Sequence, residues 1–246
     1  MDSQDDKVAR PELEAYLLGV LDYEDALRLQ RRLVYEVSGA RGELASLVIC
    51  EHHPIITVGR LGSRSHIDCD DDELAARRLP VRWVNRGGGC NLHLPGQVVA
   101  YPILPFPPSK LAIREYLGRL ERWLLAVLDE FGVRGTTQPN HRGIWSPGGQ
   151  IASIGVSISR WVTYHGVALN VSGTIDQFRI LHPEGNGSLR ATTMEAQRQR
   201  PAPMAKVRES LLRLFVETFD LDRYHLFSQH PMLSQPRRTH AYAGSV

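Results

Sequence analysis

The chain has 246 residues, of which 42% are hydrophobic and 23% are charged, and its formal net charge is +2. This composition is ordinary for a globular protein, and the length allows a sizeable buried core in one domain or two. So small a net charge provides no field that attracts nucleic acid or an anionic membrane, so neither is expected as a partner.

The first predicted helix covers residues 23–37. Its apolar residues, among them Leu33 and Val37, share one face, and charged residues occupy the opposite face. Residues 45–60 follow with two short apolar runs that Pro54 separates, and these predict two strands on either side of a turn.

The middle of the chain alternates helix and strand signals. Residues 70–78 begin with acidic and end with basic side chains, which suits the dipole of a short helix. Residues 81–85 predict a strand that leads into a glycine-rich loop. Residues 98–104 predict another strand, whose proline indicates a sheet edge or a strand end. Residues 111–131 carry the clearest amphipathic helix, which Gly132 ends.

The second half of the chain is rich in strands. Residues 143–146, 150–159 and 162–171 are apolar runs separated by turn residues, which is typical of antiparallel hairpins rather than of βαβ units. A last amphipathic helix is predicted at residues 204–219.

This order of elements predicts an α+β fold, with one domain built on a mixed, largely antiparallel sheet flanked by helices. The domain is expected to span residues 21–222. An irregular N-terminal segment, residues 1–20, and an irregular C-terminal tail, residues 223–246, are expected on either side of it.

The three cysteines are Cys50, Cys69 and Cys90. Their odd number and the absence of CxxC spacing argue against a disulfide framework and against a zinc knuckle. The first residues lack a signal-peptide pattern, and no apolar run approaches the ~18 residues that a membrane helix needs. We therefore expect a cytoplasmic protein.

The densest chemical signal lies in residues 85–97, NRGGGCNLHLPGQ. The three successive glycines from Gly87 to Gly89 leave backbone N–H groups open to a ligand. Arg86 is suited to bind an anion, and His93 to act as a donor or a base. A tight turn with an exposed arginine is the alternative interpretation. The spacing matches neither a P-loop nor a dinucleotide fingerprint.

Two further segments are candidate parts of a binding or catalytic site. Ala152, Ser153 and Gly155 interrupt one predicted strand, and His165 and Gly166 interrupt the next, which indicates either close approach of a ligand or a β-bulge. In LHPEGNG, Glu184 follows Pro183, and its carboxylate is either a solvated loop residue, a general base or the replacement of another group. The histidines include no HExxH motif, so no metal and no cofactor are expected.

Taken in order, these segments resemble the lipoyl(octanoyl) transferase (LipB) family. The family motif R-G-G-x-x-T-(Y/F)-H-G-P-G-Q, followed by a strand ending in Y-P, reads RGGGCNLHLPGQVVAYPI here. The upstream motifs Y-x-x-A-x-x-x-Q and E-H-x-P-x-x-T-x-G-R read YEDALRLQ and EHHPIITVGR. The downstream motifs K-I-A-(A/S)-(I/L)-G-(V/I) and H-G-x-A-L-N-V read QIASIGV and HGVALNV. The likeness covers about residues 23–219.

The resemblance implies the fold of the biotin and lipoate protein ligases. It also implies a reaction, the transfer of octanoyl from acyl carrier protein to a lysine of a lipoyl domain, and we expect a monomer to perform it. The residues implied to bind the acyl group are Arg86, Gly87, Gly88, Gly89, Cys90, Asn91, Leu92, His93, Ser153, Ile154, Gly155, Gly166, Val167 and Ala168.

The chain departs from the family at both catalytic positions. The family uses a cysteine in a P-C-G turn and a lysine at the head of K-I-A, which favours the thiolate. Glu184 and Gln150 stand at these positions here, Asn91 replaces the threonine, and Leu94 replaces the glycine after His93. A carboxylate of pKa ~4.3 is a weaker nucleophile than a thiolate of pKa ~8.5, so the covalent route of the family is not expected.

Several interpretations remain open. Glu184 can act as a general base for direct attack by the acceptor lysine, or the protein can be a non-catalytic relative that binds an acyl chain or a lipoyl domain. Cys90 can be a relocated nucleophile whose pKa Arg86 and His93 lower, or a small apolar residue in a strand. A faint likeness of GGGCNLH to the GGGAVxH loop of ATP-dependent lipoate ligases is a last alternative.

Overall fold

The computed structural model describes residues 10–107, 110–139, 141–182 and 190–233. In chain order the elements are β1 (Glu12–Leu21), α1 (Tyr23–Gly39), β2 (Leu44–His52), β3 (Ile55–Val58), α2 (Asp71–Ala76), β4 (Val81–Trp83), β5 (Cys90–His93), β6 (Gln97–Ile103), α3 (Lys110–Glu130), β7 (Thr136–Gln138), β8 (His141–Ser146), β9 (Gly149–Ser159), β10 (Val162–Asn170), α4 (Met194–Arg198), α5 (Met204–Thr218) and β11 (Tyr224–Phe227).

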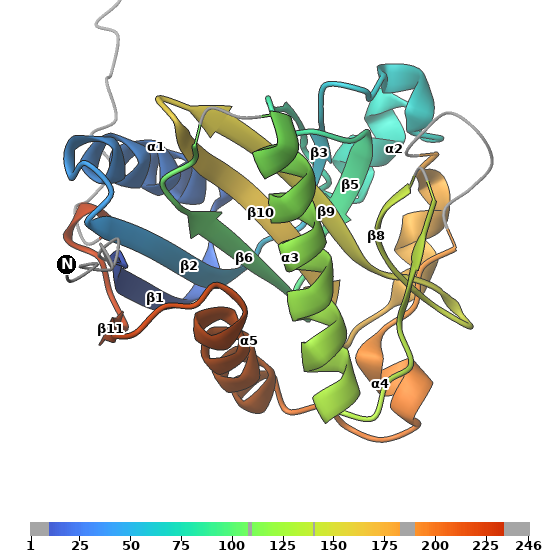
Figure 1. Cartoon of the computed structure of the whole chain (residues 1–246). Coiled ribbons are helices and arrows are strands. Elements are labelled where there is room, and N and C mark those ends of the chain that lie inside the picture. The colour runs from blue at the N-terminus through green and yellow to red at the C-terminus, as the bar shows by residue number, and fades with distance from the viewer. Residues whose placement is uncertain (1–9, 108–109, 140, 183–189, 234–246) are drawn as a thin grey trace, which may run out of the picture.

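Eight strands form one mixed sheet in the order β11-β1-β2-β6-β10-β9-β8-β7 (Figure 1). Strand β1 runs parallel to both of its neighbours, and the other neighbouring strands are antiparallel. A second sheet has the order β4-β3-β5. The α+β fold with a mixed, largely antiparallel sheet is therefore confirmed, with a small second sheet beside the large one.

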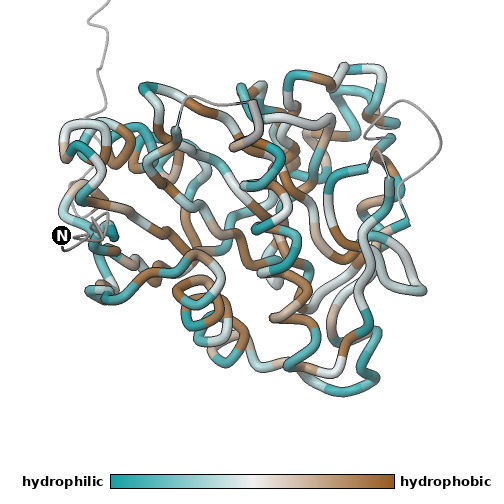
Figure 2. Tube along the Cα trace, in the orientation of Figure 1, coloured by the Kyte–Doolittle hydropathy of each residue, from teal (hydrophilic) through white to brown (hydrophobic). Residues whose placement is uncertain are grey.

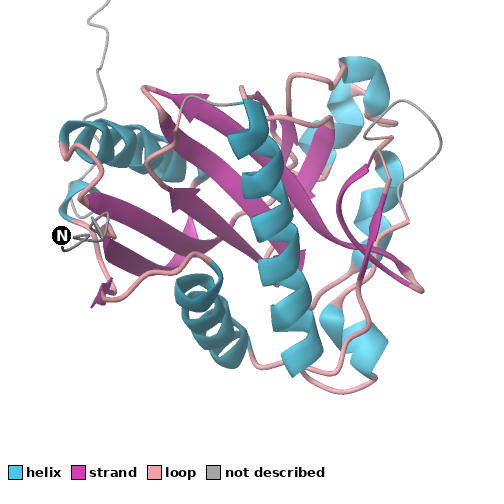
Figure 3. Ribbon diagram, in the orientation of Figure 1, coloured by secondary structure: helices cyan, strands magenta, loops and turns pink. Residues whose placement is uncertain are grey.

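Helices cover both faces of the large sheet (Figures 1 and 3). On one face, α3 and α5 meet through Trp123 and Phe215, whose ring centroids lie 5.0 Å apart inside the largest core cluster. On the other face, α1 packs through Leu33 against a cluster that includes Val48 of β2. Figure 2 shows that the central strands are mostly hydrophobic, which is expected for a sheet buried on both faces.

The second sheet is joined to the large sheet at β9, where the N–H of Gly87 donates to the carbonyl oxygen of Val156 at 2.9 Å. Beside the second sheet itself, the N–H of Gly59 donates to the carbonyl oxygen of Gly89 at 3.0 Å. Leu92 and Phe178 belong to the core cluster behind this sheet. The glycine-rich segment is thus held directly beside β9.

Both terminal predictions are wrong in part. The irregular segment expected at residues 1–20 contains most of β1, and the irregular tail expected at residues 223–246 contains β11, which pairs with β1. These pairings join segments that are far apart in the sequence, so local patterns did not reveal them. Cys90–His93 is likewise a strand rather than part of a loop, because it pairs with β3.

The proline signal at residues 98–104 marks a strand end and not a sheet edge. Strand β6 lies between β2 and β10, and Pro102 is its second-last residue. No helix within the described ranges is long and apolar enough to cross a membrane.

Candidate functional site

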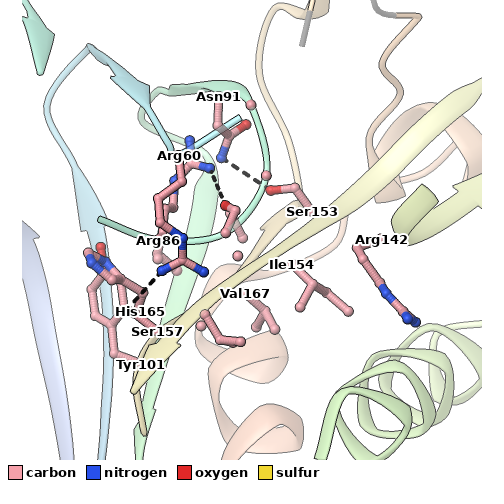
Figure 4. A pocket seen from close by; sticks show the side chains of 18 of the residues that line it. Arg60, Arg86, Asn91, Tyr101, Arg142, Ser153, Ile154, Ser157, His165 and Val167 are labelled. Atoms are coloured by element: carbon pink, nitrogen blue, oxygen red, sulfur yellow. Dashed lines mark hydrogen bonds between the residues drawn. The ribbon is translucent and has the colours of Figure 1, made fainter. Parts of the chain in front are cut away.

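A cavity of about 550 Å³ lies where the glycine-rich segment meets β9 and β10 (Figure 4). All of the predicted binding residues except Leu92 border this cavity. Leu92 is fully buried in the core behind the second sheet, because alternation along β5 turns it away from Asn91 and His93. The other lining residues are Tyr23, Arg60, Leu61, Val99, Tyr101, Ile113, Leu117, Arg142, Gln150, Val156, Ser157, Ile158 and His165.

Arg86 is a buried cation in the cavity wall. Its Nη2 donates to the carbonyl oxygen of Thr57 at 2.9 Å and to Oγ1 of Thr57 at 2.8 Å, while Nη1 donates to the carbonyl oxygen of Gly87 at 2.9 Å. Its Nε is buried without a partner. Within the described residues, no ion pair joins Arg86 to a carboxylate, so its positive charge has no anionic partner among them. The alternative interpretation, a tight turn with an exposed arginine, is therefore wrong, because Arg86 is buried.

His93 uses both ring nitrogens within the protein. Its Nδ1 lies 2.7 Å from Oε1 of Gln97, and its Nε2 lies 3.2 Å from Oγ1 of Thr57. Gln97 donates through Nε2 to Leu92 and Asn170, so its Oε1 accepts from His93. Since Thr57 Oγ1 already accepts from Arg86, its hydroxyl donates to His93.

This arrangement makes His93 a neutral, structural ring. Burial lowers its pKa well below the ordinary value, and the nearby His52 and Arg86 lower it further. His52 repeats the pattern, because its Nδ1 donates to the carbonyl oxygen of Leu21 and its Nε2 accepts from the hydroxyl of Tyr101. Burial lowers the pKa of His52 to about 4. Neither ring has a nitrogen left to act as a base.

His165 differs from both of these rings. It lies inside β10 with a φ of 56°, and its backbone N–H donates to Oε1 of Gln30 on α1 at 2.8 Å. Its Nδ1 is buried and has no partner. Burial lowers its pKa to about 3, and the charges of Arg86 and Arg60 contribute to the shift. His165 also borders a second hollow of about 580 Å³, whose lining includes Arg31, Arg82 and Arg160.

Gly155 and Gly166 face each other across β9 and β10. A Cβ on Gly155 would lie 2.9 Å from the carbonyl oxygen of Gly87, and one on Gly166 would lie 2.2 Å from that of Ala100. The pairing of β9 with β10 is unbroken at both glycines, whereas the pairing of β9 with β8 shifts register between Gln150 and Ala152, so the bulge interpretation holds only on the β8 side. Neighbouring backbone requires glycine at both positions, and both also border the cavity.

The cavity has a polar part and an apolar part. On one face of β9, Ser153 accepts through Oγ a hydrogen bond of 3.1 Å from Nδ2 of Asn91, and Arg86 borders the same cavity. On the other face, Ile154 belongs to the cluster that packs under α3, and Ile113 and Leu117 of α3 also border the cavity. A ligand with a polar head and an aliphatic chain fits this division.

Gln150, at the start of β9, borders the cavity. Its backbone N–H donates to the carbonyl oxygen of Arg190 at 2.8 Å, and its carbonyl oxygen accepts from Thr192 at 2.9 Å. The N–H of His182 donates to the carbonyl oxygen of His66 at 2.8 Å. Glu184 lies outside the described residues, but the residues that flank it in the chain are joined to the second-sheet region and to Gln150.

The cysteines are not activated in this structure. Cys90 is buried, its thiol donates to the carbonyl oxygen of Ser63 at 3.6 Å, and burial raises its pKa despite the charge of Arg86. Burial also raises the pKa of Cys50 and of Cys69. A thiolate nucleophile needs a lowered pKa, so the geometry favours a structural Cys90 over a relocated nucleophile.

Motifs alone did not single out several of the residues that shape the site. Thr57 lies in a short apolar strand, and only its buried hydroxyl shows its place between Arg86 and His93. Ile113 and Leu117 belong to an amphipathic stripe that reads as ordinary core. Within the described part of the chain, no cluster of histidine, cysteine and acidic residues is arranged to hold a metal ion.

Comparison with known proteins gives matches over most of the chain. Residues 22–216 match the lipoyl protein ligase A/B catalytic domain. An octanoyltransferase of Myxococcus xanthus is 36% identical over 218 residues, which are 86% of this chain and 60% of that protein. An octanoyltransferase of Geobacter metallireducens is 37% identical over 198 residues, which are 80% of this chain and 89% of that protein.

Solved structures agree on the fold. A putative lipoate protein ligase of T. acidophilum with bound lipoic acid superposes with a TM-score of 0.69 at 15% identity, covering 90% of this chain and 91% of that one. A lipoate-protein ligase A bound with ATP superposes with a TM-score of 0.68 at 14% identity, covering 91% and 90%.

Proposed function

The chain belongs to the lipoyl protein ligase A/B catalytic-domain family, and from this premise we propose that it transfers an octanoyl group from acyl carrier protein to a lysine of a lipoyl domain. The relatives that are octanoyltransferases support this substrate class. The chain spans less than two thirds of the Myxococcus relative but most of the Geobacter relative.

One observation carries the proposal, and it is the division of the cavity. Arg86 supplies a buried charge, unpaired with any carboxylate of the described residues, at the polar part, where the oxygen of a thioester becomes negative during attack. Ile113, Leu117 and Ile154 supply the apolar part, which suits an acyl chain. A volume of about 550 Å³ falls within the range of small-molecule sites.

The reaction we propose is direct attack, with Glu184 as the general base. Glu184 takes a proton from the acceptor ammonium, and the free amine attacks the thioester carbon. The C–N bond forms, the C–S bond breaks, and the departing thiolate takes up a proton. General-base assistance is worth about 10²- to 10⁴-fold in rate. Gln150, being uncharged, is proposed to orient the reacting groups by hydrogen bonding.

The state of the cysteines supports direct attack over a covalent intermediate. All three cysteines of the chain have raised pKa values, so none offers a thiolate at neutral pH. The second candidate is a relative that binds the acyl group without turnover, which the replacement of the family cysteine and lysine by Glu184 and Gln150 favours. A cytoplasmic location and a monomeric state stay predictions.

Intact-mass measurement tests this proposal. The protein is incubated with octanoyl-acyl carrier protein and an apo lipoyl domain, and the masses of all three are recorded. We expect the lipoyl domain to gain one octanoyl group while the protein itself gains none. Glu184→Ala should slow the transfer by about 100-fold or more. Glu209→Ala, which changes an exposed carboxylate paired with Lys206, is the matched control and should leave it unchanged.

Other outcomes would correct the proposal in distinct ways. Octanoyl on the protein itself, lost in Cys90→Ala, would establish the covalent route instead. Full activity in Glu184→Ala would remove the general base. No transfer at enzyme excess, although octanoyl-acyl carrier protein still binds, would establish the binding protein. Transfer of free lipoate that requires ATP would establish a ligase.

A further inference from the structure

His165 has the backbone conformation of a turn although it lies inside a strand. Its φ is 56°, in the left-handed region that few non-glycine residues adopt, although histidine, asparagine and aspartate adopt it more often than the others. The other described non-glycine residues with positive φ, Arg41, Arg78, Arg160, Trp161, Gln199 and Asp220, all lie in turns or just after helices. Strain of this kind persists only where the surrounding structure enforces it, and it gathers at functional sites.

Two contacts hold this conformation in place. The backbone N–H donates to Oε1 of Gln30, so helix α1 fixes the peptide. The ring stacks on Tyr164 with the centroids 4.7 Å apart. The residue borders the cavity together with Arg60 and Arg86. The strained position thereby lies in the wall of the cavity.

The ring nitrogen that results has nothing to bind in the protein. Among the buried polar side-chain atoms without a partner in the described structure, only Nε of Arg86 and Nδ1 of His165 belong to residues that border this cavity. Buried polar groups are nearly always hydrogen-bonded, so each exception needs an explanation. Both atoms are enclosed in this structure, and a turn of the imidazole toward the cavity would give Nδ1 of His165 a ligand oxygen as its partner.

The surroundings also decide the protonation state of the ring. Burial and the charges of Arg86, Arg60 and Arg31 lower the pKa of His165 to about 3. The imidazole is therefore neutral near pH 7 and too weak a base to deprotonate a lysine ammonium. A neutral imidazole still has one N–H to donate.

We propose that His165 donates a hydrogen bond from Nδ1 to the carbonyl oxygen of the bound acyl group. This inference rests on the proposed function. As the acceptor amine adds to the thioester carbon, the oxygen becomes negative and the hydrogen bond strengthens. No proton leaves the ring, because the proton balance of the reaction runs through the base and the thiol. His165 is then a catalytic residue that contacts the reacting group, and Arg86 adds its charge from the same wall.

Two substitutions separate the ring from the backbone strain. His165→Gly accepts the positive φ and removes the ring, so any loss of stability comes from the emptied space and not from backbone strain. His165→Asn also tolerates the left-handed conformation and restores an N–H donor. Gln199→Gly is the matched control, because Gln199 has a φ of 52° at the end of α4 and does not border the cavity.

The kinetic test uses octanoyl-acyl carrier protein and an apo lipoyl domain. We expect His165→Gly to lower kcat by about 100-fold with little change in the KM for the lipoyl domain. His165→Asn should regain at least a tenth of the kcat that His165→Gly loses. Gln199→Gly should have the same kcat as the unmodified protein. The pH–rate profile should keep its shape in His165→Asn. A kcat within threefold of the unmodified protein in His165→Gly, or an acidic limb that disappears in His165→Asn, would overturn the proposal.

A binding test keeps this inference separate from the proposed function. Octanamide has the same carbonyl oxygen and chain but cannot be transferred. One hydrogen bond predicts about a tenfold weaker affinity in His165→Gly and partial recovery in His165→Asn. If these octanamide affinities are found but no variant transfers octanoyl, the proposed function is refuted and the hydrogen bond from His165 to the carbonyl oxygen is supported. Equal octanamide affinity in all three proteins would refute the inference even if transfer is observed.

Discussion

His93 and His165 border the same cavity, yet the protein treats them in opposite ways. His93 lies in the regular strand β5, and its two ring nitrogens hydrogen-bond to Gln97 and Thr57. His165 lies in a strained position of β10 and leaves Nδ1 without a partner. Both rings are neutral because burial lowers their pKa values. Neither charge nor burial distinguishes them, so the difference lies in hydrogen bonding.

This contrast separates the scaffold from the contact surface. The network around His93 includes Thr57 and Gln97 and holds the Arg86 side chain in the wall. Damage there should cost stability first and activity as a consequence. Nδ1 of His165 has no partner in the protein, so a substitution that removes the ring breaks none of its hydrogen bonds and should cost activity more than it costs stability.

The largest expected effect is on stability at acidic pH. Each of the buried rings His52, His93 and His165 has a folded-state pKa below the unfolded value, so the unfolded chain takes up protons first. Stability is fully present above about pH 6.5 and falls below it by about 1.4 kcal/mol per ring and pH unit. The three together should cost about 4 kcal/mol between pH 6.5 and 5.5 as an upper bound.

Urea unfolding at a series of pH values measures this loss. Gln199→Gly, which removes no titratable group, is the control and should leave the slope against pH unchanged. His165→Gly and His93→Gln should each reduce the slope, because each removes one buried ring. A free energy of unfolding that stays constant from pH 7.5 to 5 would show that these rings are not buried as neutral groups.

The next effect concerns the packing of Arg86 against β9. A methyl group on Gly155 would lie 2.9 Å from the carbonyl oxygen of Gly87 and 3.0 Å from Cδ of Arg86. Gly155→Ala should therefore destabilise the fold by about 2 to 3 kcal/mol and reduce octanoyl transfer. Gly118→Ala in α3, where the nearest atom is 3.5 Å away, should stabilise it by about 0.5 to 1 kcal/mol. Thermal unfolding of both variants checks the pair, and equal shifts would contradict the close approach.

A smaller effect is expected from the network itself. Thr57→Val keeps the shape but leaves Nε2 of His93 without a donor, which should cost about 1 to 3 kcal/mol of unfolding free energy. Thr136→Val, at an exposed hydroxyl, should cost less than about 0.5 kcal/mol. With octanoyl-acyl carrier protein, Thr57→Val should lose less kcat than His165→Gly. The reverse order of kcat values would undo the distinction between the two regions.

The smallest effect is predicted at Cys90. Cys90→Ala removes a buried sulfur that packs in the core behind β5, so about 1 kcal/mol of stability should be lost. Octanoyl transfer should stay within twofold of the unmodified protein, because the thiol takes no part in the chemistry. Loss of all transfer, with the fold intact by circular dichroism, would return Cys90 to the active site.

Local pattern was enough to predict the main helices and the central strands. The helices expected at residues 23–37, 111–131 and 204–219 correspond to α1, α3 and α5 within two residues at each end. Strands β1 and β11 escaped prediction, because their pairing joins Leu13 to Tyr224 across most of the chain. A pattern of a few residues carries no information about so distant a partner.

Sequence predicted the site residues whose type and motif both indicate binding. It did not predict features that depend on which side chains hydrogen-bond to each other in the folded protein. The glycines and Arg86 were found from their residue types. Sequence alone could not show that both ring nitrogens of His93 have hydrogen-bond partners, because Thr57 and Gln97 contact the ring from different strands. Nor could it show the positive φ of His165, since β-strand propensity at VTYHGVALN is strong on both sides.

The most direct test of the account is nitrogen NMR of the protein labelled with ¹⁵N-histidine, without and with octanamide. We expect His93 and His52 to appear as neutral rings protonated at Nδ1, with resonances that octanamide leaves unchanged. The Nδ1 resonance of His165, assigned by its absence in His165→Asn, should shift on binding. A shift of the His93 resonances with none at His165 would contradict the claim that the unpartnered Nδ1 of His165 binds the acyl group.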